Sequence, residues 1–214
     1  MKFNVEIKIC GINSYDSAKA SIGAEYIGFV FYPKSPRFLN AFDAKEIASY
    51  LNPTQKKVGL FVNADINVIK HISDFVNLDM IQLHGDETIN DIKIIKDMMK
   101  KPIIKALPVN TYKDIEDCKK IEDVCDMLLF DTKTSTGKSG GTGLPFDWNL
   151  LKNVKLKKKW MLAGGLNINN VEDALSITNA PVIDISSGVE IEKGIKCEKK
   201  IKNLINHLKN EIKK

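Results

Sequence analysis

Residues that could carry chemistry recur in this 214-residue chain at one kind of place, directly after a short apolar run or in the loop that follows it. Each is polar, small or a glycine. If the apolar runs are parallel strands, their carboxyl ends meet at one edge of a sheet, and these side chains would share one site. The residues are Cys10, Arg37, His84, Asp131, Gly164, Gly165, Ser186, Ser187 and Gly188.

The last five of these residues, from Gly164 to Gly188, have the composition of an anion-binding site. They lie in the segments AGGLN (163–167) and DISSGVE (184–190). Glycines let backbone N–H groups approach an anion, and serine hydroxyls or a helix N-terminus add donors. Two ordinary glycine turns are the alternative. However, the two segments follow the seventh and eighth apolar runs of the chain, and β/α barrels commonly bind phosphate after strands seven and eight. We therefore predict that Gly164, Gly165, Ser186, Ser187 and Gly188 bind phosphate.

Cys10 and Asp131 are candidates for proton transfer. A cysteine at a strand end is either a small buried hydrophobic residue or, as a thiolate, a base or nucleophile. Partial burial favours the protonated form of a carboxyl group, as a general acid requires, although Asp131 could also cap its loop. Asp184 lies inside an apolar run, where we expect it to orient its neighbours rather than react.

Two further segments could contact a ligand. Arg37, in SPRF, carries a planar fork that binds a carboxylate with two hydrogen bonds, and a surface salt bridge is the alternative. The segment TKTSTGKSGGTGLPF (132–146) is rich in Gly, Ser and Thr. It is either a flexible linker or a lid that would exclude water from the chemistry.

Eight apolar runs alternate with helical patterns and would position these residues. Asn40, with Asp43 three residues later, starts one helix in a capping-box pattern, and Ile201, Leu204, Ile205 and Leu208 give the last helix an apolar stripe. A further helix is expected around Trp148–Leu151. The expected strands are Val5–Cys10, Tyr26–Phe31, Lys57–Val62, Met80–Leu83, Pro102–Ala106, Met127–Phe130, Lys159–Ala163 and Val182–Ile185.

This alternation predicts an α/β fold, a single-domain (β/α)8 TIM barrel spanning residues 1–214. An open, doubly wound sheet is the alternative. No GxGxxG follows the first strand, which argues against dinucleotide binding.

Composition and charge narrow the class of partner. Hydrophobic residues make up 43 % and charged residues 28 %, as in globular proteins. The net charge of +5 is spread along the chain, which favours small anionic ligands over nucleic acid. The four cysteines form no CxxC pair, so we expect no metal site. Neither a signal peptide nor a membrane span is evident, so we expect a cytoplasmic protein, monomeric or homodimeric.

Taken together, the motifs resemble those of the phosphoribosylanthranilate isomerase family of tryptophan biosynthesis. The resemblance covers nearly the whole chain in order. It is carried by KICG (8–11), GFVFYPKSPRF (28–38), VGLFVN (58–63), QLHGDE (82–87), LLFDTK (128–133), GGTG (140–143), LAGGLN (162–167) and DISSGVE (184–190).

The resemblance implies an intramolecular aldose–ketose isomerase that needs no cofactor. Its reaction is the Amadori rearrangement of N-(5-phosphoribosyl)anthranilate to 1-(2-carboxyphenylamino)-1-deoxyribulose 5-phosphate. Cys10 would be the general base, Asp131 the general acid, and Arg37 would hold the anthranilate carboxylate. His84, Asp184 and Gly141 would support them. One departure is that the segment after SSGVE reads IEKGIK, without the proline usual in the family.

Three other functions fit the residues less well. A related aminoaldose-phosphate isomerase of histidine biosynthesis uses two aspartates for proton transfer, and Cys10 argues against it. A ribulose-phosphate epimerase needs histidines that bind metal, and of three histidines only His84 follows a strand. A basic scaffold without enzymatic activity would not explain why the reactive residue types line up at strand ends.

Overall fold

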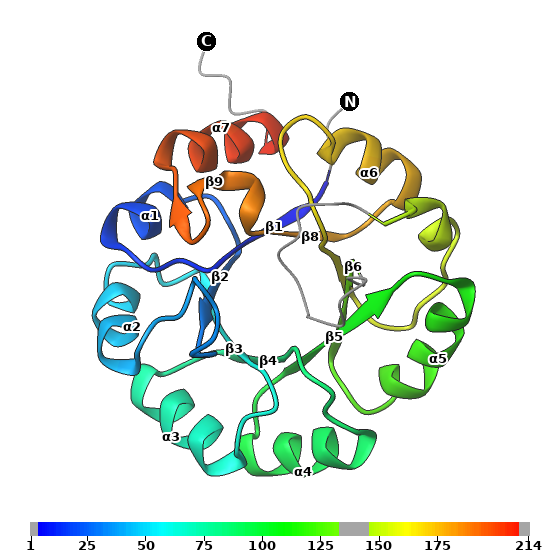
Figure 1. The fold of residues 1–214 in the computed structure, drawn as a ribbon, viewed down its shortest axis with the longest axis horizontal. Coiled ribbons are helices and arrows are strands. Elements are labelled where there is room, and N and C mark those ends of the chain that lie inside the picture. Colours follow the sequence, from blue (N-terminus) through cyan, green and yellow to red (C-terminus); the bar gives the residue numbers. More distant parts are fainter. Residues whose placement is uncertain (1–3, 133–145, 210–214) are drawn as a thin grey trace.

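The computed structural model describes residues 4–132 and 146–209, and in it eight parallel strands form a closed barrel. Each strand pairs with the next along the chain, and β1 pairs with β8 to close the ring. Figure 1 shows the helices arranged around the outside of this ring. The strands are β1 (Glu6–Cys10), β2 (Tyr26–Val30), β3 (Lys56–Phe61), β4 (Met80–Leu83), β5 (Ile103–Val109), β6 (Met127–Thr132), β7 (Trp160–Leu162) and β8 (Val182–Ile185).

Side-chain caps fix where several helices begin. Asn40 accepts a hydrogen bond from the backbone N–H of Asp43, as the sequence predicts. Ser14, Thr88 and Thr111 each form a complete capping box. The helices are α1 (Tyr15–Ala20), α2 (Ala41–Ala48), α3 (Ile66–Val76), α4 (Ile89–Met99), α5 (Tyr112–Glu122), α6 (Val171–Thr178) and α7 (Glu198–Lys209).

Every strand begins within one residue of its expected start, but two strands end later than expected. β5 continues to Val109 and β6 to Thr132, because these two strands stay paired as far as Val109 and Thr132. Asp131 therefore lies within β6, opposite Pro108, rather than after the strand. The helix expected around Trp148–Leu151 is a four-residue 3-10 helix, η1, and not an α-helix.

A small hairpin follows β8, in a segment for which the sequence predicts no strand. After the short 3-10 helix η2 (Ser187–Val189), strands β9 (Glu190–Glu192) and β10 (Ile195–Lys196) pair in antiparallel fashion before α7 begins. Gly194 makes its turn with a φ of +90°, a conformation that glycine adopts without strain. The segment is too short and too polar to show a strand pattern, which is why the hairpin was not predicted.

The core has two layers, because side chains alternate between the faces of each strand. Outward-facing residues such as Ile7, Ile81 and Leu128 are fully buried under the helices. Inward-facing Val58, Met161 and their neighbours fill the barrel itself. In the ranges that the structure describes, no helix is long and apolar enough to cross a membrane.

The buried outer layer predicts a large contrast between two isoleucines. Ile81 is inaccessible between β4 and its helices, whereas Ile94 on α4 is 47 % exposed. Ile81→Ala should lower the free energy of unfolding by about 2–5 kcal/mol, because it leaves a cavity. Ile94→Ala, the matched control, should cost less than about 1 kcal/mol. Urea denaturation measures both, and equal losses would contradict the burial described.

Candidate active site

Cys10 lies at the carboxyl end of β1, on its inner face. The residue is 5 % exposed and packs with Val30 and Leu60. Gly28 stands opposite on β2, and a β-carbon there would come within 3.0 Å of Sγ. Gly28 therefore makes room for the thiol. Burial raises the pKa of Cys10, and the nearby ammonium groups of Lys8 and Lys196 partly offset that rise.

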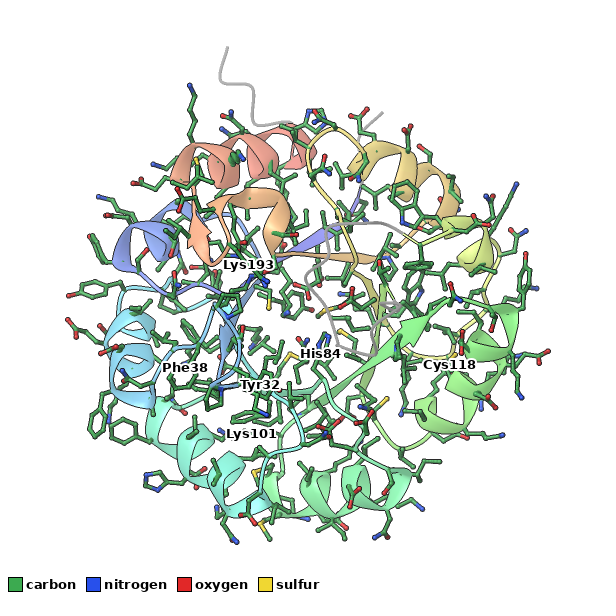
Figure 2. All side chains as sticks on the ribbon, in the orientation of Figure 1. Tyr32, Phe38, His84, Lys101, Cys118 and Lys193 are labelled. Carbon is green, nitrogen blue, oxygen red and sulfur yellow. The ribbon has the colours of Figure 1, made fainter. Side chains whose placement is uncertain are left out.

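Asp131 lies at the end of a chain of three polar side chains. The Asp131 Oδ2 atom is 3.2 Å from His84 Nε2, and His84 Nδ1 is 2.9 Å from Gln82 Nε2. Gln82 and His84 are two residues apart at the end of β4, so both face the interior. Figure 2 shows His84 inside the ring of strands. Because an amide nitrogen can only donate, Nδ1 accepts, and Nε2 carries the proton that faces the carboxylate.

The loop that presents His84 is held from below. The Glu87 carboxylate accepts hydrogen bonds from the backbone N–H groups of Asn63 (2.9 Å) and Gly85 (3.0 Å). It also pairs with Lys105 Nζ at 2.7 Å, and both side chains are almost fully buried. These contacts fix the QLHGDE segment, so His84 is held in place beside Asp131 by β5 as well as by its own strand.

A small cavity opens beside this chain of side chains. It lies where β4, β5 and β6 end, next to the carboxyl group of Asp131. Its lining residues are His84, Gly85, Asp86, Ala106, Leu107, Pro108, Asp131 and Thr132. A reacting group bound here would meet Asp131 at the mouth of the barrel.

Arg37 is buried at the mouth and is already bound to a carboxylate of the protein. Its Nε and Nη2 atoms lie 2.7 and 2.9 Å from the two carboxylate oxygens of Glu190. Its stem passes over Gly11, beside Cys10, where a β-carbon would come within 2.8 Å of Arg37 Cδ. The contact with Gly11 and the pair with Glu190 thus fix the position of the guanidinium at the mouth. Nη1 is the nitrogen outside the pair with Glu190, and binding of a ligand carboxylate by Arg37 stays a prediction.

Glu190 also binds Lys196, on the other strand of the hairpin. Lys196 Nζ lies 2.7 Å from Glu190 Oε1, and it donates to the carbonyl and hydroxyl oxygens of Ser186 at 2.9 and 3.1 Å. Although burial would raise the pKa of Glu190, the Arg37 hydrogen bond and the charge of Lys196 hold it below its ordinary value. The hairpin thus fastens the loop after β8 to the loop after β2.

The loops after β7 and β8 touch each other, as the phosphate prediction requires. Gly164 and Gly165 have φ values of +88° and +65°. A β-carbon on Gly188 would collide with the Leu166 carbonyl oxygen, and one on Gly164 with the Thr132 hydroxyl. The predicted residues on these loops therefore come together at one side of the mouth. That they bind phosphate stays a prediction.

Sequence reasoning missed Lys8, Gln82, Glu190 and Lys196. A signal existed for the first two, because Lys8 precedes Cys10, and Gln82 precedes His84, by the two-residue spacing that keeps side chains on one strand face. Gly141 lies outside the described residues. Within residues 4–132 and 146–209, no three or more His, Cys, Asp or Glu side chains are grouped so that they could hold a metal.

Comparison with known proteins identifies the family. Residues 7–207 match the family described as N-(5'phosphoribosyl)anthranilate (PRA) isomerase. This chain belongs to that family. It is an isomerase of tryptophan biosynthesis, and the isomerase of histidine biosynthesis is not favoured.

Relatives in the isomerase family align over nearly their full lengths. The N-(5'-phosphoribosyl)anthranilate isomerase of Paracoccus denitrificans is 41 % identical, over 94 % of this chain and 95 % of the relative. That of Bradyrhizobium diazoefficiens is 38 % identical, over 93 % and 91 %. The crystal structure of the Thermotoga maritima isomerase superposes with a TM-score of 0.86 at 37 % identity, covering 96 % of this chain and 99 % of that one. A TIM barrel is thereby confirmed.

The contacts of His84 predict which ring nitrogen carries its proton. In its neutral form His84 should be protonated on Nε2, because Nδ1 accepts from Gln82 and Nε2 faces the Asp131 carboxylate. Long-range proton–nitrogen NMR correlations distinguish the two tautomers. The chain has only three histidines, so His71→Gln and His207→Gln serve as assignment controls. A proton found on Nδ1 would contradict the chain of contacts described.

Proposed function

We propose that this isomerase converts N-(5'-phosphoribosyl)anthranilate to 1-(2-carboxyphenylamino)-1-deoxyribulose 5-phosphate, with Asp131 as general acid and Cys10 as general base. The carrying observation is that both groups face the interior at the mouth of one barrel, Cys10 on β1 and Asp131 on β6. A related crystal structure with a TM-score of 0.82 and 34 % identity holds a reduced form of that product.

In the first step, Asp131 reacts in its protonated form and gives its carboxyl proton to the ring oxygen of the ribose. The bond between that oxygen and the anomeric carbon breaks, and the nitrogen lone pair forms a protonated Schiff base. Asp131 is held by His84 Nε2 and by the backbone N–H of Thr132, which lies 2.7 Å from Oδ1. These contacts fix the carboxyl group and stabilise the carboxylate that the proton transfer leaves behind.

In the second step, the Cys10 thiolate removes the proton from the second carbon of the sugar. The electron pair of that C–H bond forms a carbon–carbon double bond and neutralises the iminium nitrogen, giving an enolamine. The enolamine then tautomerises to the ketone. The buried position of Cys10 beside Val30 and Leu60 keeps water away from the base.

Binding groups surround this pair of residues. The loops that carry Gly164, Gly165, Ser186, Ser187 and Gly188 would hold the phosphate at the β7–β8 side of the mouth. Arg37 would present Nη1 to the anthranilate carboxylate while Glu190 keeps its fork in place. Hydrogen bonds to the phosphate at one end and to the carboxylate at the other would hold the substrate across the mouth of the barrel.

We also propose that the protein acts in the cytoplasm, as a monomer or a homodimer, with residues 1–214 as one domain and no cofactor. A structure of Thermotoga maritima isomerase monomers derives from a dimeric enzyme. Because only two assembly states are proposed, sedimentation of the purified protein distinguishes them.

A fluorescence assay tests the proposed function. Phosphoribosylanthranilate, made in situ, should lose its fluorescence when the protein is added. Cys10→Ser and Asp131→Asn should each lower the rate by at least about 10²-fold, since each removes one proton-transfer group. Cys118→Ser is the matched control, because Cys118 lies on α5 at the outside of the barrel (Figure 2).

Far-UV circular dichroism establishes that the variants are folded. Wild-type rates in folded Cys10→Ser and Asp131→Asn would contradict the proposed mechanism. If the protein converts the histidine-pathway aminoaldose but not phosphoribosylanthranilate, the substrate assignment is wrong.

The phosphate site is tested by inorganic phosphate alone. At 100 times its Kd, phosphate stabilises the folded state by about 2.7 kcal/mol, which raises Tm by roughly 5–10 °C in a protein of this size. Gly188→Ala should abolish this rise, because the new β-carbon forces the β7 and β8 loops apart. Gly59→Ala, which crowds Leu78 on the outer face of β3, should keep it. An undiminished rise in Gly188→Ala would place the anion elsewhere.

A further inference from the structure

Lys8 is a charged side chain fully enclosed in the barrel. It is 0 % exposed and lies on β1, beside Asp184 on β8. Its Nζ atom is 3.0 Å from Asp184 Oδ2. Burial of a charge is costly even when it is paired, and a pair of well-packed apolar residues is often at least as stable. The barrel interior therefore gives no packing reason for an ammonium group at this position.

The ion pair between Lys8 and Asp184 leaves polar atoms without hydrogen bonds. Among the described residues, neither Lys8 Nζ nor Asp184 Oδ1 has a hydrogen-bond partner. A lysine ammonium has three N–H donors, and leaving them unsatisfied inside a protein is unfavourable. The ammonium thus keeps donors available for whatever lies next to it on the inner face of the barrel.

The next inward-facing side chain on the same strand is Cys10. Residues two apart on a strand point to the same side, so Lys8 stands directly beneath the thiol. The ammonium interacts electrostatically with Cys10 as well as with Asp184. Gly28, opposite Cys10, leaves the space that the thiol occupies on this inner face.

We propose that Lys8 is a positioning residue that favours formation of the Cys10 thiolate from beneath, with Asp184 keeping the ammonium in place. The inference rests on the proposed function, in which Cys10 acts as the base. A neutral thiol among Val30 and Leu60 would be unreactive, whereas a thiolate next to an ammonium is stabilised without transfer of a proton.

Other charges also face Cys10 and set the background for this effect. Lys196 of β10 lies above the thiol and, like Lys8, favours its ionised form, whereas Asp184 disfavours it. Arg37 passes beside Cys10 over Gly11, and Glu190 binds both Arg37 and Lys196. Glu190 thereby offsets the positive charges above the thiol, while Lys8 has a carboxylate partner of its own beneath it.

The test measures ionisation of Cys10 directly. The rate of alkylation by iodoacetamide is followed against pH, and peptide mass spectrometry reports Cys10 separately from the other three cysteines. Lys8→Met should move the midpoint upward by about one pH unit or more, because a nearby charge shifts a pKa by about 1–3 units. Asp184→Asn should move it downward, since a like charge is removed.

Two further variants keep the test decisive. Lys8→Met/Asp184→Asn removes both charges, so it avoids an unpaired buried carboxylate if Lys8→Met fails to fold. Its midpoint should lie above that of the wild type and below that of Lys8→Met. Lys105→Met removes another buried, paired lysine, on β5, and should leave the Cys10 midpoint unchanged.

A purely structural role for Lys8 would leave the midpoint of the double variant at the wild-type value, and that result would overturn the inference. A fully active Cys10→Ser would overturn the proposed base instead, whatever the midpoints are. Support for both requires the low-pH limb of kcat/KM to move with the alkylation midpoint.

Discussion

Hydrogen bonding between β1 and β8 closes the barrel, and the arrangement of the site depends on it. The register of this pair sets Lys8 beside Asp184, and Ile9 beside Ile185. It thereby places Cys10, the residue after Ile9, next to the loop that begins at Ser186. Neither end of the chain could form this site alone, because the first strand supplies the thiol and the last supplies the carboxylate and the loop.

The mouth of the barrel is organised by buried charges that are matched locally. Glu190 neutralises Arg37 and Lys196 above Cys10, and Asp184 pairs with Lys8 beneath it. Such pairs are poor sources of stability, since desolvation costs about as much as the attraction returns. These pairs do fix the positions of the charged groups. They therefore add little stability but hold the hairpin and Arg37 in a preorganised site.

The sequence predicted most of the fold and part of the site. Apolar runs located every strand start within one residue, because burial on both faces leaves a continuous hydrophobic signal. The predicted ends of β5 and β6 were wrong. Pro108 and Asp131 interrupt the hydrophobic signal, although backbone pairing continues past both residues. The hairpin of Glu190–Glu192 and Ile195–Lys196 was missed, because its strands are held by Arg37 and Ser186 rather than by an apolar pattern of their own.

The sequence by itself determined the order of strands and helices, the residue types at each strand end, and the family that they resemble. These are local properties, written in hydrophobic spacing and short motifs. Only the tertiary structure decided which of these residues meet: Gln82 with His84 and Asp131, Arg37 with Glu190, and Lys8 with Asp184. The reason is physical, because Arg37 and Glu190 are 153 positions apart in the chain, and ring closure, which no local pattern encodes, brings such partners together.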